Sequence, residues 1–255
     1  FDELGRVGPY DPLMGRGNPA RSANLKSYLD FCVNEQKRAG VCARQASPLL
    51  EGAVKRLLVG MESRLDKLGE AAVVKKLELG MYRALFATAL SCGRRGHGLS
   101  HIQIPRIIKL PDGSGLMVEA LLSKTLREQK DCFGLRRQSV ADRAICPVTL
   151  IEQWVDLATP MGFDMTRGWL FFNFAWPAWG KRYLDPRVMM QRLRSFILEV
   201  GMEEAALAKS TMHGFRVGMV ITKLLAGEEL GRIMRDAAWK KQSTVAAYAK
   251  LYHVL

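Results

Sequence analysis

The chain has 255 residues, 48% of them hydrophobic, which is enough for one large domain or two small ones with a sizeable core. No apolar run reaches the roughly 18 residues of a transmembrane helix, and the N-terminal segment lacks the pattern of a signal peptide. Lys and Arg number 38 against 25 Asp and Glu, and the net charge of +13 favours a polyanionic partner such as nucleic acid. We therefore expect a globular intracellular protein with no membrane partner.

Three helices are predicted in the first part of the chain. Ser22 is placed to cap a helix over residues 22–40, in which Leu25, Leu29 and Val33 share one face. Two further helical patterns follow, at residues 47–69 and 70–91.

The period of the hydrophobic residues then changes from helix to strand. Two apolar runs, residues 106–110 and 116–122, flank a Pro-Asp-Gly turn and predict a hairpin, and residues 143–148 predict a third short strand. Helical patterns return after this point in five segments: residues 149–158, 186–201, 215–227, 228–238 and 244–252. The expected fold class is mainly α with a small antiparallel β-sheet, an α+β arrangement.

The cysteines and histidines do not predict a metal site. The five cysteines are odd in number, widely spaced and never in a C-x-x-C pair, so we expect reduced thiols in a cytosolic or nuclear compartment. His97 and His101 stand four residues apart near Cys92, but no further ligand completes a zinc spacing. Phosphate-binding loop, G-x-S-x-G and H-E-x-x-H motifs are also missing from the sequence, so nucleotide-driven or metal-driven chemistry finds no support.

Four residues near the C-terminus follow one another in an informative order. His213 and Arg216 form an H-x-x-R pair, Trp239 comes 23 residues after Arg216, and Tyr248 comes nine residues after Trp239. This stretch, "HGFRVG…AAWKKQSTVAAY", resembles the catalytic C-terminus of the tyrosine recombinases, the site-specific recombinases and phage-type integrases. In that family an H-x-x-R pair, a His or Trp and a nucleophilic Tyr occur in this order.

Two upstream positions fit the same resemblance. The family places a catalytic Arg after a helix in an R-x-x-[ED]-L pattern, and Arg95 with Leu99 takes that position here. A catalytic Lys follows the second strand of a hairpin in the family, and Lys124 follows the predicted one. The resemblance implies a tyrosine recombinase catalytic domain over residues 48–255. It also implies that residues 1–47 are an N-terminal arm and helix, which we interpret as the end of a DNA-clamping domain.

The physical chemistry of these side chains agrees with the implied reaction. A phenol with a pKa of about 10 is a weak nucleophile, so attack by Tyr248 on a phosphodiester requires a polarised phosphate. Arg95 and Arg216 offer charged, planar donors to phosphate oxygens, and His213 and Trp239 add neutral N–H donors. These groups would stabilise the transition state electrostatically.

The resemblance further implies the other participants in the reaction. Lys124 would act as the general acid that protonates the departing 5′ oxygen. Double-stranded DNA would be the substrate, a homo-tetramer would assemble on it, and neither a cofactor, a metal nor a small-molecule substrate would be needed. The location would be the nucleus in a eukaryote, or the cytoplasm and nucleoid in a prokaryote.

The sequence departs from the family at several points and leaves alternatives open. Gly98 replaces the acidic residue that follows the first Arg, and Ala237 and Ala238 replace a common glycine pair. Arg94 competes with Arg95 for the catalytic position, and Tyr252 competes with Tyr248 as the nucleophile. The segments "GRGNPARS", "EQKRAG…RQASPL" and "KTLR" resemble recombinases of Crypton-type and DIRS-type mobile elements. A type IB topoisomerase, or an inactive domesticated DNA-binding protein, would also fit the pattern.

Overall fold

The computed structural model describes most of the chain, and the C-terminal segment is among the parts that it leaves out. The described residues are 11, 14, 17, 22–38, 46–120, 131–174, 182–202, 210–237 and 239. The chain divides into two compact units, Phe1–Gln45 and Ala46–Leu255.

The first unit contains helix α1 (Ala23–Arg38). Ser22 caps it as the sequence predicts, because its Oγ accepts a hydrogen bond from the backbone N–H of Leu25 at 3.0 Å. Leu25 and Leu29, which share one face of the helix, are both exposed.

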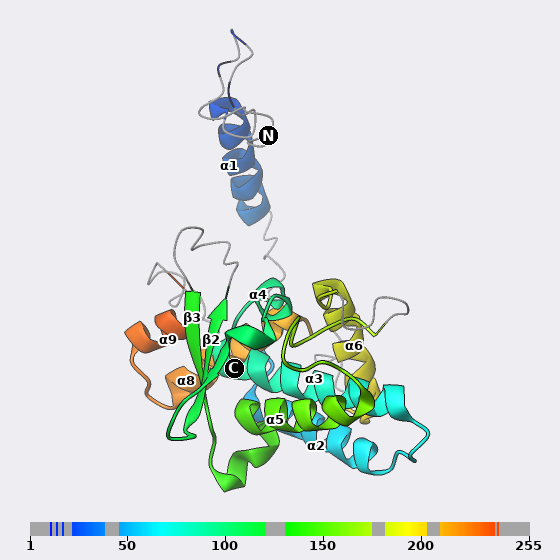
Figure 1. Ribbon diagram of the computed structural model, residues 1–255. Coiled ribbons are helices and arrows are strands. Elements are labelled where there is room, and N and C mark those ends of the chain that lie inside the picture. The colour runs from blue at the N-terminus through cyan, green and yellow to red at the C-terminus, as the bar shows by residue number, and fades with distance from the viewer. Residues whose placement is uncertain are drawn as a thin grey trace. The chain divides into compact units, whose positions relative to one another are not determined.

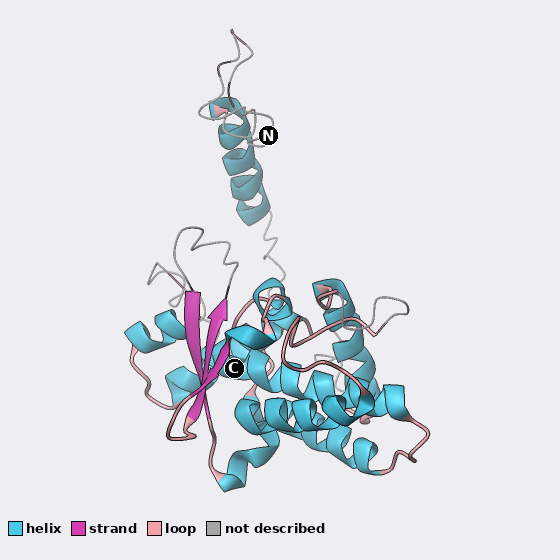
Figure 2. Ribbon diagram, in the orientation of Figure 1, coloured by secondary structure: helices cyan, strands magenta, loops and turns pink. Residues whose placement is uncertain are grey.

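The second unit is built around helix α3 (Val73–Cys92), whose C-terminal half is buried on all sides (Figures 1 and 2). Helices α2 (Glu51–Asp66), α5 (Pro147–Ala158) and α8 (Met212–Leu225) pack against it. Most side chains of this half are apolar and need neighbours on nearly every side, which explains the central place of the helix. Among the described residues, no helix is both long and apolar enough to span a lipid bilayer.

Three further α-helices lie in the described part of this unit. They are the five-residue α4 (Gly96–Ser100), α6 (Pro186–Glu199) and the seven-residue α9 (Leu230–Asp236). Helices α4 and α8 both contact α6, and α9 contacts α8. All the predicted helices up to residue 238 are therefore present, and the one predicted at residues 244–252 lies outside the described residues.

A small antiparallel sheet lies beside α8 and α9 (Figure 1). Its strands are β1 (Ile107–Lys109), β2 (Gly115–Ala120) and β3 (Asp131–Arg136), in that spatial order. The predicted hairpin is confirmed, since β1 and β2 pair across the Pro-Asp-Gly turn, where Gly113 has a φ of 69°. Alternate side chains face the core, as the two-residue period requires: Leu116, Val118, Phe133 and Leu135.

The predicted third strand at residues 143–148 is wrong. Residues Val140–Ile145 form 3-10 turns, and α5 begins at Pro147, whose ring favours the first helical position. The Cys146 sulfur caps this helix by accepting the N–H of Thr149 at 3.4 Å. The third strand is β3 instead, and its Asp and Gly residues weaken the strand signal in the sequence.

Candidate active site

Helix α8 is fixed in place by a close backbone approach at its two glycines. A Cβ atom on Gly214 would lie 2.5 Å from the Ser47 carbonyl oxygen, and one on Gly218 would lie 1.9 Å from that of Leu49. The Leu49 N–H also donates to the Gly214 carbonyl oxygen at 3.0 Å. The glycines of "HGFRVG" therefore let residues 47–49 lie directly against the helix.

The aromatic core sets the rotation of α8 about its axis. Phe215 is fully buried, and its ring stacks on Phe86 of α3 with centroids 5.5 Å apart. His213 precedes Phe215 and is exposed on the first turn of the helix, whereas Arg216 follows it and is buried. One helical turn thus carries an exposed histidine and a buried arginine.

Arg216 joins three elements of the fold. Its Nη1 donates to the Gly93 carbonyl oxygen at 3.0 Å, and its Nη2 donates to the Ala237 carbonyl oxygen at 2.8 Å. Its Cζ atom lies 4.5 Å from the centre of the Trp239 ring, a cation–π contact. The turn after α3, helix α8 and the end of α9 therefore meet at one guanidinium, which is only 2% exposed.

Arg95 lies at the start of α4, directly after the turn that accepts the Arg216 hydrogen bond. Gly93 ends α3 in the left-handed conformation with a φ of 56°, and Arg95 is the N-cap residue of α4. A Cβ on Gly96 would come within 3.7 Å of the Met212 side chain, so the starts of α4 and α8 are adjacent. Arg95 itself is exposed.

The two neighbouring arginines of this turn differ in their surroundings. Arg94 is 6% exposed, and its Cζ lies 4.7 Å from the centre of the Phe133 ring of β3. Arg95 lies instead on the open side with His213. This difference favours Arg95 over Arg94 as the arginine that meets a ligand.

The charges of both arginines act on His213. Burial against protein atoms lowers the pKa of this histidine, although the residue is partly accessible to solvent, and the charges of Arg216 and Arg95 lower it further. The imidazole is therefore neutral near pH 7, so one ring nitrogen carries a proton and the other carries a lone pair.

The N-terminal end of α8 has the properties of an anion site. The positive end of the helix dipole adds to the charges of Arg95 and Arg216. The hydroxyl oxygens of Ser210 and Thr211, at the residues just before the helix, are buried without a hydrogen-bond partner among the residues that the structure describes. The sequence analysis missed these hydroxyls, and it also missed the carbonyl groups that bind Arg216, because backbone acceptors leave no signal in the sequence.

Three predicted residues lie outside the described residues: Lys124, Tyr248 and the alternative nucleophile Tyr252. Lys124 belongs to the segment 121–130 between β2 and β3. The structure thus brings together Arg95, His213, Arg216 and Trp239, and leaves the positions of the lysine and the tyrosines as predictions.

Gly98, the departure from the family pattern, has space around it. A Cβ at this position would have its nearest neighbour, the Arg94 Cβ, at 3.9 Å, which is an ordinary contact. Among the described residues, no carboxylate forms an ion pair with Arg95. The backbone would therefore accommodate the acidic residue of the family pattern, and with glycine at this position its carboxylate is absent.

The histidines that were considered as metal ligands pack against each other instead. The rings of His97 and His101 are stacked with centroids 4.2 Å apart, and the Cys92 sulfur donates to the Thr88 carbonyl oxygen. Burial raises the pKa of the Cys92 thiol to about 11. Within the described part of the chain, no group of three or more His, Cys, Asp or Glu is arranged to hold a metal ion.

The sequence matches no protein-family model and no curated protein. The fold, however, is similar to solved structures of recombinases. The post-cleavage complex of the XerH site-specific recombinase with palindromic difH substrate aligns over 83% of this chain and 53% of its own, with a TM-score of 0.58 and 14% identity. Its pre-cleavage complex with difH aligns over 81% and 51%, with a TM-score of 0.57 and 14% identity.

The XerA recombinase aligns over 81% of this chain and 60% of its own, with a TM-score of 0.55 and 17% identity. This chain therefore spans between half and three fifths of the length of these recombinases. The similarity confirms the predicted fold, that of a tyrosine recombinase catalytic domain with a mainly helical structure and a small antiparallel sheet.

Proposed function

We propose that this chain carries the catalytic domain of a site-specific DNA recombinase, which cleaves and rejoins DNA through a 3′-phosphotyrosyl intermediate. The observation that carries the proposal is the convergence of Arg95, His213 and Arg216 at the start of one helix, in a fold shared with DNA-bound recombinases. The net charge of +13 supports duplex DNA as the partner.

The arginines and the histidine form the site for the scissile phosphate. Arg95 is exposed and presents its guanidinium to the non-bridging oxygens, while Arg216 adds a second positive charge from a fixed, buried position. A fixed charge stabilises the pentacoordinate transition state without reorganising during the reaction. Trp239 packs on Arg216 and keeps its plane in place.

Tyr248 is the proposed nucleophile of the cleavage step. The phenol oxygen attacks phosphorus, its proton passes to the neutral ring of His213, and the bond from phosphorus to the 5′ oxygen breaks. Lys124 gives a proton to the departing oxygen, and the 3′ phosphate stays on the tyrosine. Attack by a 5′ hydroxyl reverses these steps and rejoins the strand, so no nucleotide or metal cofactor is consumed.

The proposed assembly is a homo-tetramer that forms on DNA, because exchange between two duplexes requires four cleaved strands. Light scattering should find smaller species in the free protein and a tetramer on its DNA site. A stable tetramer without DNA would contradict the DNA-dependent assembly.

Trapping the covalent intermediate tests the proposal. The protein is incubated with a pool of nicked duplexes that carry a randomised segment, so that the short 5′ fragment diffuses away after cleavage. We expect a covalent protein–DNA band on a denaturing gel, and mass spectrometry should find the nucleotide on the peptide that contains Tyr248. The absence of an adduct over the whole pool would support an inactive DNA-binding protein, and relaxation of supercoiled plasmid by monomers would support a topoisomerase.

A further inference from the structure

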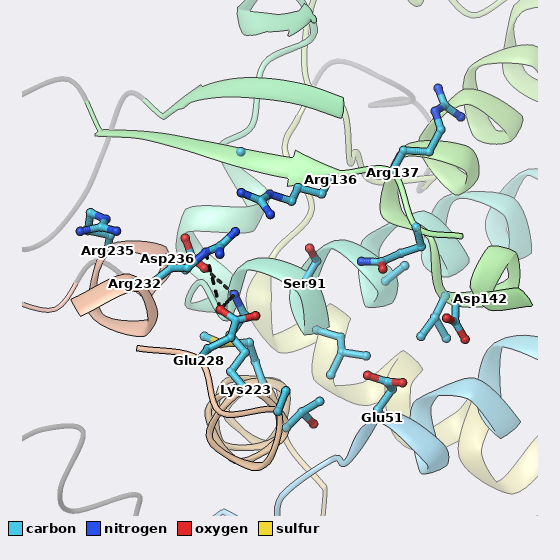
Figure 3. A pocket seen from close by; sticks show the side chains of 18 residues that line it. Glu51, Ser91, Arg136, Arg137, Asp142, Lys223, Glu228, Arg232, Arg235 and Asp236 are labelled. Atoms are coloured by element: carbon cyan, nitrogen blue, oxygen red, sulfur yellow. Dashed lines mark hydrogen bonds and ion pairs between the residues drawn. The ribbon is translucent and has the colours of Figure 1, made fainter. Parts of the chain in front are cut away.

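A pocket of about 670 Å³ lies between α3, β3, α8 and α9 (Figure 3). Nine of the 18 residues that line it are charged, and five of these lie on α8, on α9 or between them: Lys223, Glu228, Arg232, Arg235 and Asp236. There the side chain of Lys223 points from α8 toward Glu228 and Asp236, which lie before and at the end of α9 (Figure 3).

Lys223 forms ion pairs with both carboxylates. Its Nζ contacts the Asp236 carboxylate directly and lies 3.4 Å from Oε2 of Glu228. The Lys223 side chain is 19% exposed, and those of Glu228 and Asp236 are 30% and 35% exposed. Ion pairs that are partly removed from water are screened less by salt than pairs on the open surface.

The same ion pair lies next to the backbone group that holds Arg216. Asp236 directly precedes Ala237, whose carbonyl oxygen accepts the Arg216 hydrogen bond at 2.8 Å. Trp239, two residues further on, packs its ring on the same guanidinium. The position of Arg216 therefore depends on where α9 ends.

Apolar contacts also join α8 and α9. The buried cluster between them consists of Met219, Val220, Ile233 and Ala237, and the partly buried Leu224, Met234 and Trp239 pack against it. A helix of seven residues is unstable by itself and takes its position from its neighbours. Arg232 also pairs with Glu228, its Nε lying 3.7 Å from the Glu228 Oε2. Without Lys223, Asp236 would lose its ion pair with α8 and Glu228 would keep only Arg232, so the two carboxylates would no longer tie the end of α9 to α8.

We infer that Lys223 and Asp236 are positioning residues, which hold the end of α9 so that Ala237 and Trp239 fix the guanidinium of Arg216. The inference rests on the proposed function for its effect on DNA cleavage, but its structural part concerns the free protein. Neither residue contacts the scissile phosphate in the proposed reaction.

Two measurements on the same variants test the inference. The first is fluorine NMR of DNA-free protein labelled with fluorotryptophan, in which Trp239→Phe identifies one signal among the five tryptophans. The second is the rate of adduct formation on the nicked-duplex pool, together with DNA affinity. Lys223→Met should shift the Trp239 signal and slow cleavage by about 10- to 100-fold, while DNA affinity stays unchanged.

Two further variants serve as controls. Lys223→Arg keeps the charge and should restore both the signal and the rate. Lys55→Met removes another ion pair between elements, the one with Asp142 at 3.1 Å, far along the chain from α8 and α9. It should leave both readouts as in the wild type.

Each outcome decides the inference. An unmoved Trp239 signal in Lys223→Met overturns it, as does a shifted signal with an unchanged cleavage rate, or an equal shift in Lys55→Met. If the wild type forms no adduct but the signal shifts in Lys223→Met and not in the controls, Lys223 positions Arg216 and the proposed recombinase reaction falls.

Discussion

The guanidinium of Arg216 lies 4.5 Å over the ring of Trp239, and it also binds the carbonyl oxygens of Gly93 and Ala237. A side chain with these three contacts contributes to the fold as well as to the charge of the site. Arg95, which is exposed at the start of α4, has no comparable contacts among the described residues. The two arginines of the proposed site therefore differ in what their loss would do.

Substitution of each arginine separates these two contributions. Arg216→Ala leaves the Gly93 and Ala237 carbonyl groups without their donor and should lower the free energy of unfolding by about 1–3 kcal/mol. Arg95→Ala should change it by less than about 0.5 kcal/mol. Both should slow adduct formation by about 100- to 1,000-fold, since each removes charge from the transition state. Urea unfolding and single-turnover cleavage measure the two effects, and equal stability of the two variants would refute the distinction.

The tyrosine that becomes linked to DNA can be identified by removing one oxygen atom. Tyr248→Phe should keep the fold and the DNA affinity but form no adduct, because the phenyl ring has no nucleophile. Tyr252→Phe should still cleave. Peptide mapping of the trapped complex checks both results, and a nucleotide on a peptide with Tyr252 but not Tyr248 would reverse the assignment.

The glycines of α8 should be intolerant of a methyl group. In Gly218→Ala the new Cβ would lie 1.9 Å from the Leu49 carbonyl oxygen, so backbone must move and the free energy of unfolding should fall by about 1–3 kcal/mol. Gly231→Ala is the matched control in α9, where a Cβ meets no atom within 4 Å, and alanine should stabilise the helix by up to about 1 kcal/mol. Thermal unfolding compares the two, and a neutral Gly218→Ala would show that residues 47–49 do not lie on α8 as described.

The titration of His213 should report the two arginine charges. Its pKa lies below the ordinary value of about 6.5, because of burial first and the charges of Arg216 and Arg95 next. Arg95→Ala removes one of these charges and should raise the pKa, though not to the ordinary value. NMR titration of the imidazole signal measures the change, and an unchanged or lower midpoint in the variant would place Arg95 away from His213.

Because the pKa of His213 is lowered in the folded state, the free energy of unfolding should depend on pH. The unfolded chain binds the His213 proton more readily than the folded one, so protonation favours unfolding. Well above about pH 6.5, His213 should not affect the free energy of unfolding. As the pH falls below about 6.5, protonation of this residue should lower the free energy of unfolding. His213→Asn should lose this part of the acid destabilisation in urea titrations at a series of pH values. His97, whose pKa is also lowered, would leave a residual effect in that variant.

Binding to duplex DNA should weaken steeply with salt. Phosphate contacts by Lys and Arg release counterions, and six or more of them would reduce the affinity by about 1,000-fold or more between roughly 50 and 200 mM salt. Fluorescence anisotropy with a mixed-sequence duplex measures the slope. A flat dependence would indicate that the charge of +13 is dispersed over the surface without a phosphate-binding face.

The sequence by itself determined most of the helices, because their apolar residues recur at helical spacing and their ends carry local signals. Ser22 before α1 is such a signal, and it caps the helix as predicted. Pro147 at the start of α5 is another, although the prediction placed it in a strand. The β1–β2 hairpin was predictable for the same reason, since the turn and its Gly113 lie within a few residues of both strands. The fold was indicated by a family resemblance that rests on the combined order and spacing of six residues: Arg95, Lys124, His213, Arg216, Trp239 and Tyr248.

Only the tertiary structure decided how the site is assembled, because its contacts join residues far apart in the sequence. Strand β3 exists through its pairing with β2, which offsets the weak local preference of its Asp and Gly residues. Packing buries Arg94 against Phe133 and leaves Arg95 open, although the two are neighbours in sequence. The anchoring of Arg216 depends on carbonyl groups 123 and 21 residues away, and backbone carbonyl groups are the same at every position.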